Sequence, residues 1–294
     1  MISKSRLGFV LAIVIVFFAG IFLGNFNKQN LPILWPSNNE DIVYATINEW
    51  DSERFSDASN FKKISLNTDE NTGIFLTYGQ SNSANHGRVN VDYYPNVYQF
   101  FLGEVYEYKN PSLGATGVDD SVWGLVGNKL ITQNMYTKVI FANTGWGGMS
   151  ISQLKEGHYF DFFINTYKDL FNRFGRVDAI LFHQGESDNY PDRVDLYYDN
   201  FIKFVRSIED QGIEVPIYLS QASYCTSAFP VNEVLTNSQR KLVIDNDIIL
   251  QGPNTDLLID TEFRFDQCHF SEKGNEKFAN MWVESIKSNI SNYI

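Results

Sequence analysis

Short apolar runs alternate with longer amphipathic segments from residue 73 to the end of the chain. Each run is nearly continuous in apolar residues, which is typical of strands that are buried on both faces of a parallel sheet. The pattern predicts strands at 73–80, 138–145, 177–184, 215–222 and 247–253.

Three amphipathic segments between or after these runs carry apolar residues at helical spacing. The segments 161–175 and 192–212 each end at a glycine, and a third helix begins after Ser271, a plausible N-cap. The residues expected to face the core are Phe163, Tyr167, Leu170, Phe171, Phe174, Tyr197, Phe201, Phe204, Val205, Ile208, Phe278, Met281, Trp282 and Ile286. Alternating strands and helices predict a doubly wound α/β domain.

Polar and glycine-rich sets follow four of the predicted strands. They read GQSN (79–82), GWGGMS (145–150), HQGESD (183–188) and QASYC (221–225). In an open parallel sheet, ligands bind in the crevice beyond the carboxyl ends of the strands. We therefore expect these four sets to gather at one edge and to form a site.

The first residues differ in character from the rest of the chain. Residues 1–6 carry Lys4 and Arg6, and residues 7–24 form an uncharged apolar run of about 27 Å as a helix. We expect a transmembrane signal-anchor with a cytoplasmic tail and an extracytoplasmic domain at 71–294, joined by a tether and lead-in at 25–70. Secretion after cleavage of a signal peptide is the main alternative, and a buried soluble helix is the third.

Charge and cysteine content narrow the class of protein. The formal net charge is −12, which would repel a phosphate backbone, so we exclude nucleic acid as a partner. The two cysteines, Cys225 and Cys268, lack the spacing of a metal site. They form either one disulfide or two buried thiols, and we expect a disulfide that braces the loop of His269.

A serine directly after the first strand is a candidate nucleophile. The Ser81 hydroxyl needs a base, which is usually a histidine oriented by a carboxylate. Asp266 precedes His269 by three residues, so its carboxylate can fold back onto Nδ1 and leave Nε2 free to face Ser81. A structural histidine beside an aspartate is the common alternative for this spacing.

The other histidines are weaker candidates for the base. His86 lies five residues from Ser81 but has no carboxylate nearby in sequence, so we assign it as a substrate contact. We expect His158 on the surface or in a loop, and His183 packed beside the site. Attack on an ester also requires donors for an oxyanion. The candidate donors are the Ser81 N–H, the backbone at Gly147 and Gly148, and the Gln184 amide.

The segments GQSN, GGMSI, HQGESD and DQCHFSEKG, in this order, resemble the SGNH-hydrolase superfamily. Their similarity is greatest to its sialate O-acetylesterase-like branch, which also holds carbohydrate esterase family six, the acetylxylan esterases. The resemblance implies a flavodoxin-like three-layer sandwich and a triad of Ser81, Asp266 and His269. It also implies an oxyanion hole from the Ser81 N–H, the Gly147 N–H and the Gln184 side chain.

The resemblance places Glu186 outside the triad, as a structural or substrate-orienting residue. We expect Asn82, His86, Gly148 and Glu186 to contact substrate. The chain departs from the family pattern after Asn82, where methionine often follows, and at Met149, where threonine is frequent. Both departures lie where an acyl group or a sugar would sit, so they bear on the choice of substrate.

The expected activity is removal of O-acetyl groups from a carbohydrate through an acyl-enzyme, with no metal or organic cofactor. Two alternatives remain open at this point. A glycan O-acetyltransferase would pass the same acetyl group to a sugar hydroxyl, which product analysis with an added acceptor would reveal. A glycan-binding module with an inactive site would leave Ser81 unlabelled by a fluorophosphonate.

Overall fold

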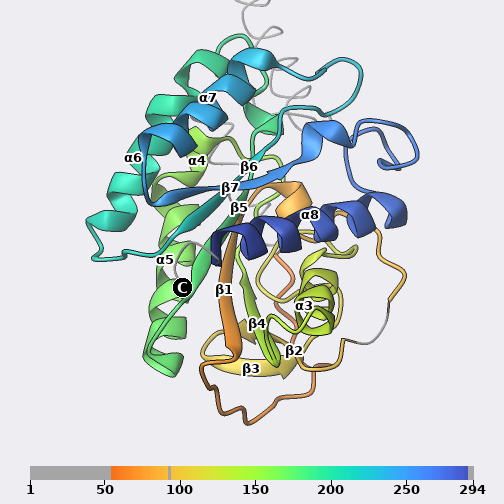
Figure 1. Ribbon diagram of the computed structural model, residues 1–294, viewed down its shortest axis with the longest axis vertical. Coiled ribbons are helices and arrows are strands. Elements are labelled where there is room, and N and C mark those ends of the chain that lie inside the picture. Colours follow the sequence, from red (N-terminus) through yellow and green to blue (C-terminus); the bar gives the residue numbers. More distant parts are fainter. Residues whose placement is uncertain (1–53, 92–93, 291–294) are drawn as a thin grey trace, which may run out of the picture. The chain divides into compact units, whose positions relative to one another are not determined.

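The computed structural model describes residues 54–91 and 94–290, which contain a seven-stranded sheet (Figure 1). Its strands are β1 (Thr72–Gly79), β2 (Val97–Phe101), β3 (Glu104–Glu107), β4 (Lys138–Asn143), β5 (Ala179–His183), β6 (Ile217–Gln221) and β7 (Ile249–Asn254). The spatial order is β3-β2-β4-β1-β5-β6-β7. All neighbouring strands are parallel except the antiparallel pair β2 and β3.

Helices cover both faces of the sheet. They are α3 (Trp123–Thr132), α4 (Ile151–Leu154), α5 (Gly157–Phe174), α6 (Tyr197–Glu209), α7 (Glu233–Asp245) and α8 (Glu272–Ile290). Helices α3 and α8 pack against each other on one face, while α4, α5, α6 and α7 lie on the other (Figure 1). This arrangement confirms the predicted α/β class with a central, mostly parallel sheet.

The alternation of side chains along β1 shows why its apolar run is continuous. All eight residues of β1 are buried. The Phe75 ring stacks on Phe141, 5.7 Å away, on the side of α3 and α8. The Tyr78 ring stacks on Phe163 of α5, with 4.5 Å between centroids. Successive side chains thus fill two separate cores, as expected for a strand in the middle of a three-layer domain.

Most elements predicted from hydrophobic periodicity are present, with boundaries shifted by a few residues. Helix α5 ends at Gly175, whose φ of 76° is left-handed. The Ser271 hydroxyl accepts the Gly274 N–H at 3.1 Å, so Ser271 caps α8 as predicted. The predicted burial of Phe171 is wrong, because this ring is 48% exposed beyond the edge of the α5 stripe.

The lead-in segment contributes to the described domain from residue 54 onward. Phe55 and Phe61 pack with Phe101 and Leu113 in a small apolar cluster. Antiparallel bridges join Lys63 to Tyr106 and Arg54 to Thr116. The stretch 54–70, part of the predicted lead-in, therefore belongs to the same compact unit as the sheet.

The predicted tail at 1–6, the anchor at 7–24 and the tether up to residue 53 lie outside the described residues. Within 54–91 and 94–290, no helix combines the length and the apolar character needed to cross a bilayer.

The strand order reverses direction at β1, which makes the end of β1 the switch point of the sheet. The chain runs from β1 to β2 and β4 on one side, and then continues on the other side with β5, β6 and β7. Ligands bind at such a switch point, beyond the carboxyl ends of the strands. The segments that follow β1, β4 and β5 carry Ser81, Gly147 and Gln184, so three of the predicted sets meet at this edge.

Candidate active site

Ser81 begins a 3-10 turn, Ser81–Ser83, immediately beyond β1. The close approach of this turn to β5 depends on Gly79, which has a φ of 135°. A Cβ atom at Gly79 would lie 1.9 Å from the carbonyl oxygen of His183. Ser81 is 6% exposed, and its hydroxyl has no hydrogen-bond partner among residues 54–91 and 94–290. The hydroxyl is thus held at a strand tip with its bonding capacity unused.

The buried Gln80 side chain ties the tip of β1 to the tip of β5. Its Oε1 accepts the backbone N–H of Ser187 at 3.0 Å and that of Gly185 at 3.3 Å. The Gln80 N–H also donates to the His183 carbonyl at 3.0 Å. Gln80 therefore fixes the Ser81 turn against the segment 183–188, a role that the sequence did not reveal.

Asp266 and His269 form the pair that their spacing predicts. Asp266 Oδ2 lies 2.6 Å from His269 Nδ1, while Oδ1 accepts the backbone N–H groups of Cys268 and His269 at 2.9 and 2.7 Å. Partial burial opposes ionisation of Asp266, but the His269 side chain and the two N–H groups hold its pKa well below the usual value. An ionised Asp266 keeps the proton on Nδ1, which leaves Nε2 of neutral His269 as an acceptor.

A buried arginine supports the loop that carries this pair. Arg264 is 1% exposed and donates to the carbonyls of Leu258, at 2.7 Å, and of Cys268. Its guanidinium lies 4.4 Å from the centroid of the Phe270 ring. Arg264 also pairs in a bridge with Phe270, which closes a short hairpin around His269. The loop is therefore held from inside the domain.

The expected disulfide between Cys225 and Cys268 is present, with the two Cα atoms 4.4 Å apart. It joins the segment after β6 to the residue that directly precedes His269. The bond therefore braces the His269 loop, as the positions of the cysteines in sequence indicated.

The Ser81 turn and the His269 loop meet through Asn82. The Asn82 amide donates to the Cys268 carbonyl at 3.3 Å and to Glu186 Oε1 at 2.9 Å. The neighbours in sequence of Ser81 and His269 are thus hydrogen-bonded to each other. Within the described residues, Ser81 and His269 themselves form no hydrogen bond. In ligand-free sites such contacts are often long and tighten only when substrate binds.

Glu186 lies inside the fold, which agrees with the structural one of the two roles that the family resemblance implied for it. It is 1% exposed and accepts hydrogen bonds from Asn82 Nδ2 and from His183 Nε2, the latter at 3.0 Å. Burial would raise the pKa of Glu186, but His183, Arg264 and Asn82 outweigh it and lower the pKa to about 2. Glu186 and Asn82 bind each other, and His183 packs beside them as predicted.

The two oxyanion donors predicted outside Ser81 have partners within the protein. The Gly147 N–H donates to the Thr116 hydroxyl at 2.7 Å. The Gln184 amide, 0% exposed, donates to the Met149 carbonyl at 3.2 Å and to Asp188. Both hydrogens of the Gln184 amide are thus used inside the fold, and the oxyanion role of Gln184 stays a prediction.

The carboxyl group that receives the Gln184 amide is itself buried. Asp188 is 1% exposed, and burial raises its pKa to about 6 despite hydrogen bonds from the Ile151 N–H and Gln184. Asp188 thus closes the turn after β5 from within.

His86 lies against the candidate base. Its ring stacks on His269 with 5.5 Å between centroids and 23° between planes, and Nε2 is 3.4 Å from the Thr116 hydroxyl. Burial and the nearby His269 lower the pKa of His86 to about 4, although Asp266 acts in the opposite direction. His86 is therefore neutral near neutral pH, and it lines the site as the sequence indicated.

Two remaining predictions concern Gly148 and His158. Gly148, with a φ of 71°, is the one residue of the segment 145–150 that is partly exposed. It can therefore contact a ligand in the crevice. His158 lies near the start of α5, with its ring 5.6 Å from Trp146, rather than in an exposed loop.

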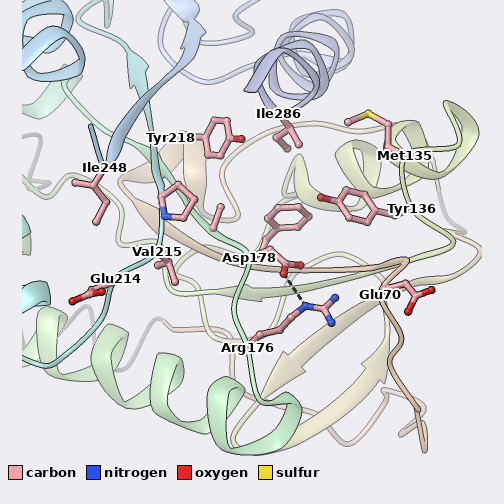
Figure 2. A pocket seen from close by; sticks show the side chains of 13 residues that line it. Glu70, Met135, Tyr136, Arg176, Asp178, Glu214, Val215, Tyr218, Ile248 and Ile286 are labelled. Atoms are coloured by element: carbon pink, nitrogen blue, oxygen red, sulfur yellow. Dashed lines mark hydrogen bonds and ion pairs between the residues drawn. The ribbon is translucent and has the colours of Figure 1, made fainter. Parts of the chain in front are cut away.

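A separate cavity of about 860 Å³ lies at the opposite edge of the sheet (Figure 2). Phe75, Ala179 and Ile248 line it, and these residues stand at or near the amino ends of β1, β5 and β7. Arg176 and Asp178 form an ion pair on its wall, with Nε and Oδ1 2.8 Å apart (Figure 2). Because the strands are parallel, this cavity lies away from Ser81 and His269.

The sequence of the domain matches a known family of esterases. Residues 71–288 match the sequence model of the family described as "Carbohydrate esterase, sialic acid-specific acetylesterase". No curated protein sequence matches the chain.

Several solved structures resemble the domain. A protein from Arabidopsis thaliana superimposes with a TM-score of 0.59 and 15% identity, over 74% of this chain and 98% of that one. NanS superimposes with a TM-score of 0.55 and 11% identity, over 77% of this chain and 100% of that one. A carbohydrate acetylesterase from Xanthomonas citri superimposes with a TM-score of 0.53 and 14% identity, over 73% of this chain and 56% of that one. At these identities the likeness supports the fold alone.

Proposed function

Because this chain belongs to the sialic acid-specific acetylesterase family of carbohydrate esterases, we propose that it removes O-acetyl groups from a carbohydrate through an acyl-enzyme on Ser81. The coarser activity, a carboxylic ester hydrolase, follows from the family. The observation that carries the finer proposal is the Asp266–His269 pair on a loop that is hydrogen-bonded to Asn82, next to Ser81.

In the first half of the reaction, His269 Nε2 takes the Ser81 proton as the hydroxyl oxygen attacks the acetyl carbonyl. The C–O bond to the sugar then breaks, and His269 returns the proton to the departing sugar oxygen. The products of this half-reaction are the free sugar hydroxyl and an acetyl ester of Ser81. Water attacks this ester with His269 again as base, and acetate leaves.

The charges around His269 suit this role. An ionised Asp266 stabilises the imidazolium that forms when His269 takes the proton, since its carboxylate lies 2.6 Å from Nδ1. The stacked His86 is neutral and therefore adds no second positive charge beside the imidazolium.

The oxyanion requires donors close to Ser81. We assign this role to the backbone N–H groups of Ser81 and Gly147, with the Thr116 hydroxyl as the group that Gly147 holds when no substrate is bound. Partly exposed Gly148 and the stacked His86 are the groups that would face the acetyl group or the sugar.

The acetylated substrate is proposed to be a glycan outside the cytoplasm. The disulfide between Cys225 and Cys268 supports an oxidising compartment. The apolar run at 7–24 would hold the enzyme at the membrane, or would be removed on secretion. Sialic acid and xylan are the acetylated glycans that the family resemblance suggests.

The direct test is acetate release from acetylated sialic acid, acetylated xylan and an aryl acetate by the wild type and by Ser81→Ala. We expect Ser81→Ala to lower turnover by at least about 10³-fold, with an unchanged circular dichroism spectrum. Ser83→Ala removes a hydroxyl from the same turn, where Ser83 Oγ only donates to the Tyr78 carbonyl, and should retain turnover. Wild-type turnover by Ser81→Ala would refute the assignment of the nucleophile.

A further inference from the structure

An exposed arginine lies beside the proposed catalytic loop. The guanidinium carbon of Arg88 lies 3.8 Å from the centroid of the Phe265 ring. The Phe265 ring is in turn 6.2 Å from the ring of His269. Arg88 thus places a permanent positive charge one aromatic ring away from the candidate base.

Arg88 belongs to a row of stacked pairs. His86 and Arg88 are two residues apart on one segment, and they cover His269 and Phe265 respectively. Phe265 and His269 are themselves paired across a hairpin, where the Phe265 N–H donates to the His269 carbonyl at 3.0 Å. The Arg88–Phe265 pair therefore continues the surface that the His86–His269 pair begins.

The backbone of Arg88 is fixed on both sides. Its N–H donates to the Phe270 carbonyl at 3.0 Å, and its carbonyl accepts the Asn275 amide at 2.9 Å. Stacking on Phe265 restrains the side chain as well, because a guanidinium is attracted to an aromatic face. Little conformational freedom remains to be lost when a ligand binds Arg88.

The charge of Arg88 is not used within the described domain. No carboxylate of residues 54–91 or 94–290 lies within 4.0 Å of its guanidinium nitrogens. Arg88 is thus an exposed cation that has no acidic partner among the described residues, although the net charge of the chain is −12. A planar guanidinium is best matched by a carboxylate or another oxyanion, which it binds through two hydrogen bonds.

We infer that Arg88 is a specificity-determining residue that binds an anionic group of the acetylated sugar. This inference rests on the proposed esterase reaction at Ser81. With the ester at Ser81 and His269, the sugar ring would extend over the row formed by His86 and Arg88. A carboxylate or a sulfate on the sugar would then pair with the guanidinium. A neutral glycan would leave Arg88 without a partner.

The test compares acetylated sugars that carry an anionic group with one whose carboxylate is masked as a methyl ester. O-acetylated N-acetylneuraminic acid and its methyl ester carry the same acetyl group, and an O-acetylated sugar sulfate distinguishes sulfate from carboxylate. We expect the wild-type kcat/KM for one of the two anionic substrates to exceed that for the methyl ester by about tenfold or more. The difference should lie mainly in KM. Arg88→Gln should reduce this preference to about one, and Arg88→Lys should retain part of it.

A matched control removes a different exposed arginine. Arg173 also lies over an aromatic ring, that of Phe174 at 5.9 Å, but at the far end of α5. Arg173→Gln lowers the net charge equally and should keep the preference for the anion, which excludes a general electrostatic effect.

The outcomes separate this inference from the proposed function. If aryl acetate hydrolysis does not depend on Ser81, the proposed function itself fails. If it depends on Ser81 but wild-type enzyme prefers neither anion over the methyl ester, only the role of Arg88 is overturned. Equal losses on charged and neutral substrates in Arg88→Gln would overturn it too. Calorimetry of Ser81→Ala with N-acetylneuraminic acid and its methyl ester gives a second readout without turnover.

Discussion

The side-chain amide of Asn82 lies 3.3 Å from the backbone carbonyl oxygen of Cys268, to which it donates a hydrogen bond. The two residues are 186 positions apart in the chain. One follows Ser81 and the other precedes His269, so this bond links the turn of the proposed nucleophile to the loop of its base. Glu186 fixes the same amide from the other side at 2.9 Å.

Asn82→Ala should impair catalysis more than substrate binding. Without the amide, the His269 loop loses its link to the Ser81 turn, and buried Glu186 loses a donor. We expect kcat to fall about 10- to 100-fold while KM changes by less than about threefold, because misplacement of catalytic groups lowers the rate itself. Steady-state kinetics on an aryl acetate measure this. A variant with wild-type kcat would show that the link does not position the pair.

Glu186→Gln should change the pH dependence of stability. The folded-state pKa of Glu186 is about 2, below the ordinary value of 4.5 for a glutamate in the unfolded chain, so its ionised form stabilises the fold above pH 4.5. That stabilisation is lost as the pH falls from about 4.5 to 2. Denaturant unfolding across this range should therefore show a smaller loss of stability for Glu186→Gln than for the wild type. Parallel curves for the two proteins would contradict an ionised Glu186.

Removal of the disulfide should lower both stability and activity. Cys225 and Cys268 are separated by 43 residues, and closing a loop of this length is worth about 4 kcal/mol in the chain-entropy account. We expect Cys225→Ala with Cys268→Ala to lower the free energy of unfolding by about 2–4 kcal/mol and to reduce turnover, since the bond braces the His269 loop. Identical melting curves with and without reductant would argue against a structural role.

Gly79→Ala should lower the stability of the fold far more than Gly212→Ala does. A Cβ atom at Gly79 would meet the His183 carbonyl oxygen at 1.9 Å, which forces β1 and β5 apart at the site. Gly212 also has a left-handed φ, of 72°, but a Cβ atom there meets nothing within 4 Å. Gly212→Ala should therefore cost only about 1–2 kcal/mol of backbone strain. Comparable melting temperatures for the two variants would contradict the close packing at Gly79.

Five of the seven strands and three of the helices could be predicted from the sequence because their patterns are local. A continuous apolar run such as β1 identifies a doubly covered strand without further information. The hairpin of β2 and β3 escaped this reasoning, since polar Gln99 interrupts its first strand and the turn at Leu102 and Gly103 depends on backbone conformation. Helix α7 carries too many polar residues for a clear apolar stripe.

In the site, too, contacts between residues close in sequence could be predicted, and contacts between distant residues could not. Asp266 and His269 are three residues apart, so their pairing could be predicted from spacing alone. The partners of Gly147 and Gln184 could not, because Thr116 is 31 residues and Met149 is 35 residues away. Which donor a distant acceptor will occupy depends on tertiary packing, so these two hydrogen bonds could not be predicted from the sequence.

Labelling by a fluorophosphonate tests whether Ser81 is the nucleophile and His269 its base. Mass spectrometry would identify the labelled residue and measure the labelling rate in the wild type and in His269→Gln. We expect an adduct on Ser81 in the wild type. Labelling should be at least about a hundredfold slower in His269→Gln, because the Ser81 hydroxyl then has no base. An adduct on a different residue, or equal labelling rates in the two proteins, would contradict this assignment.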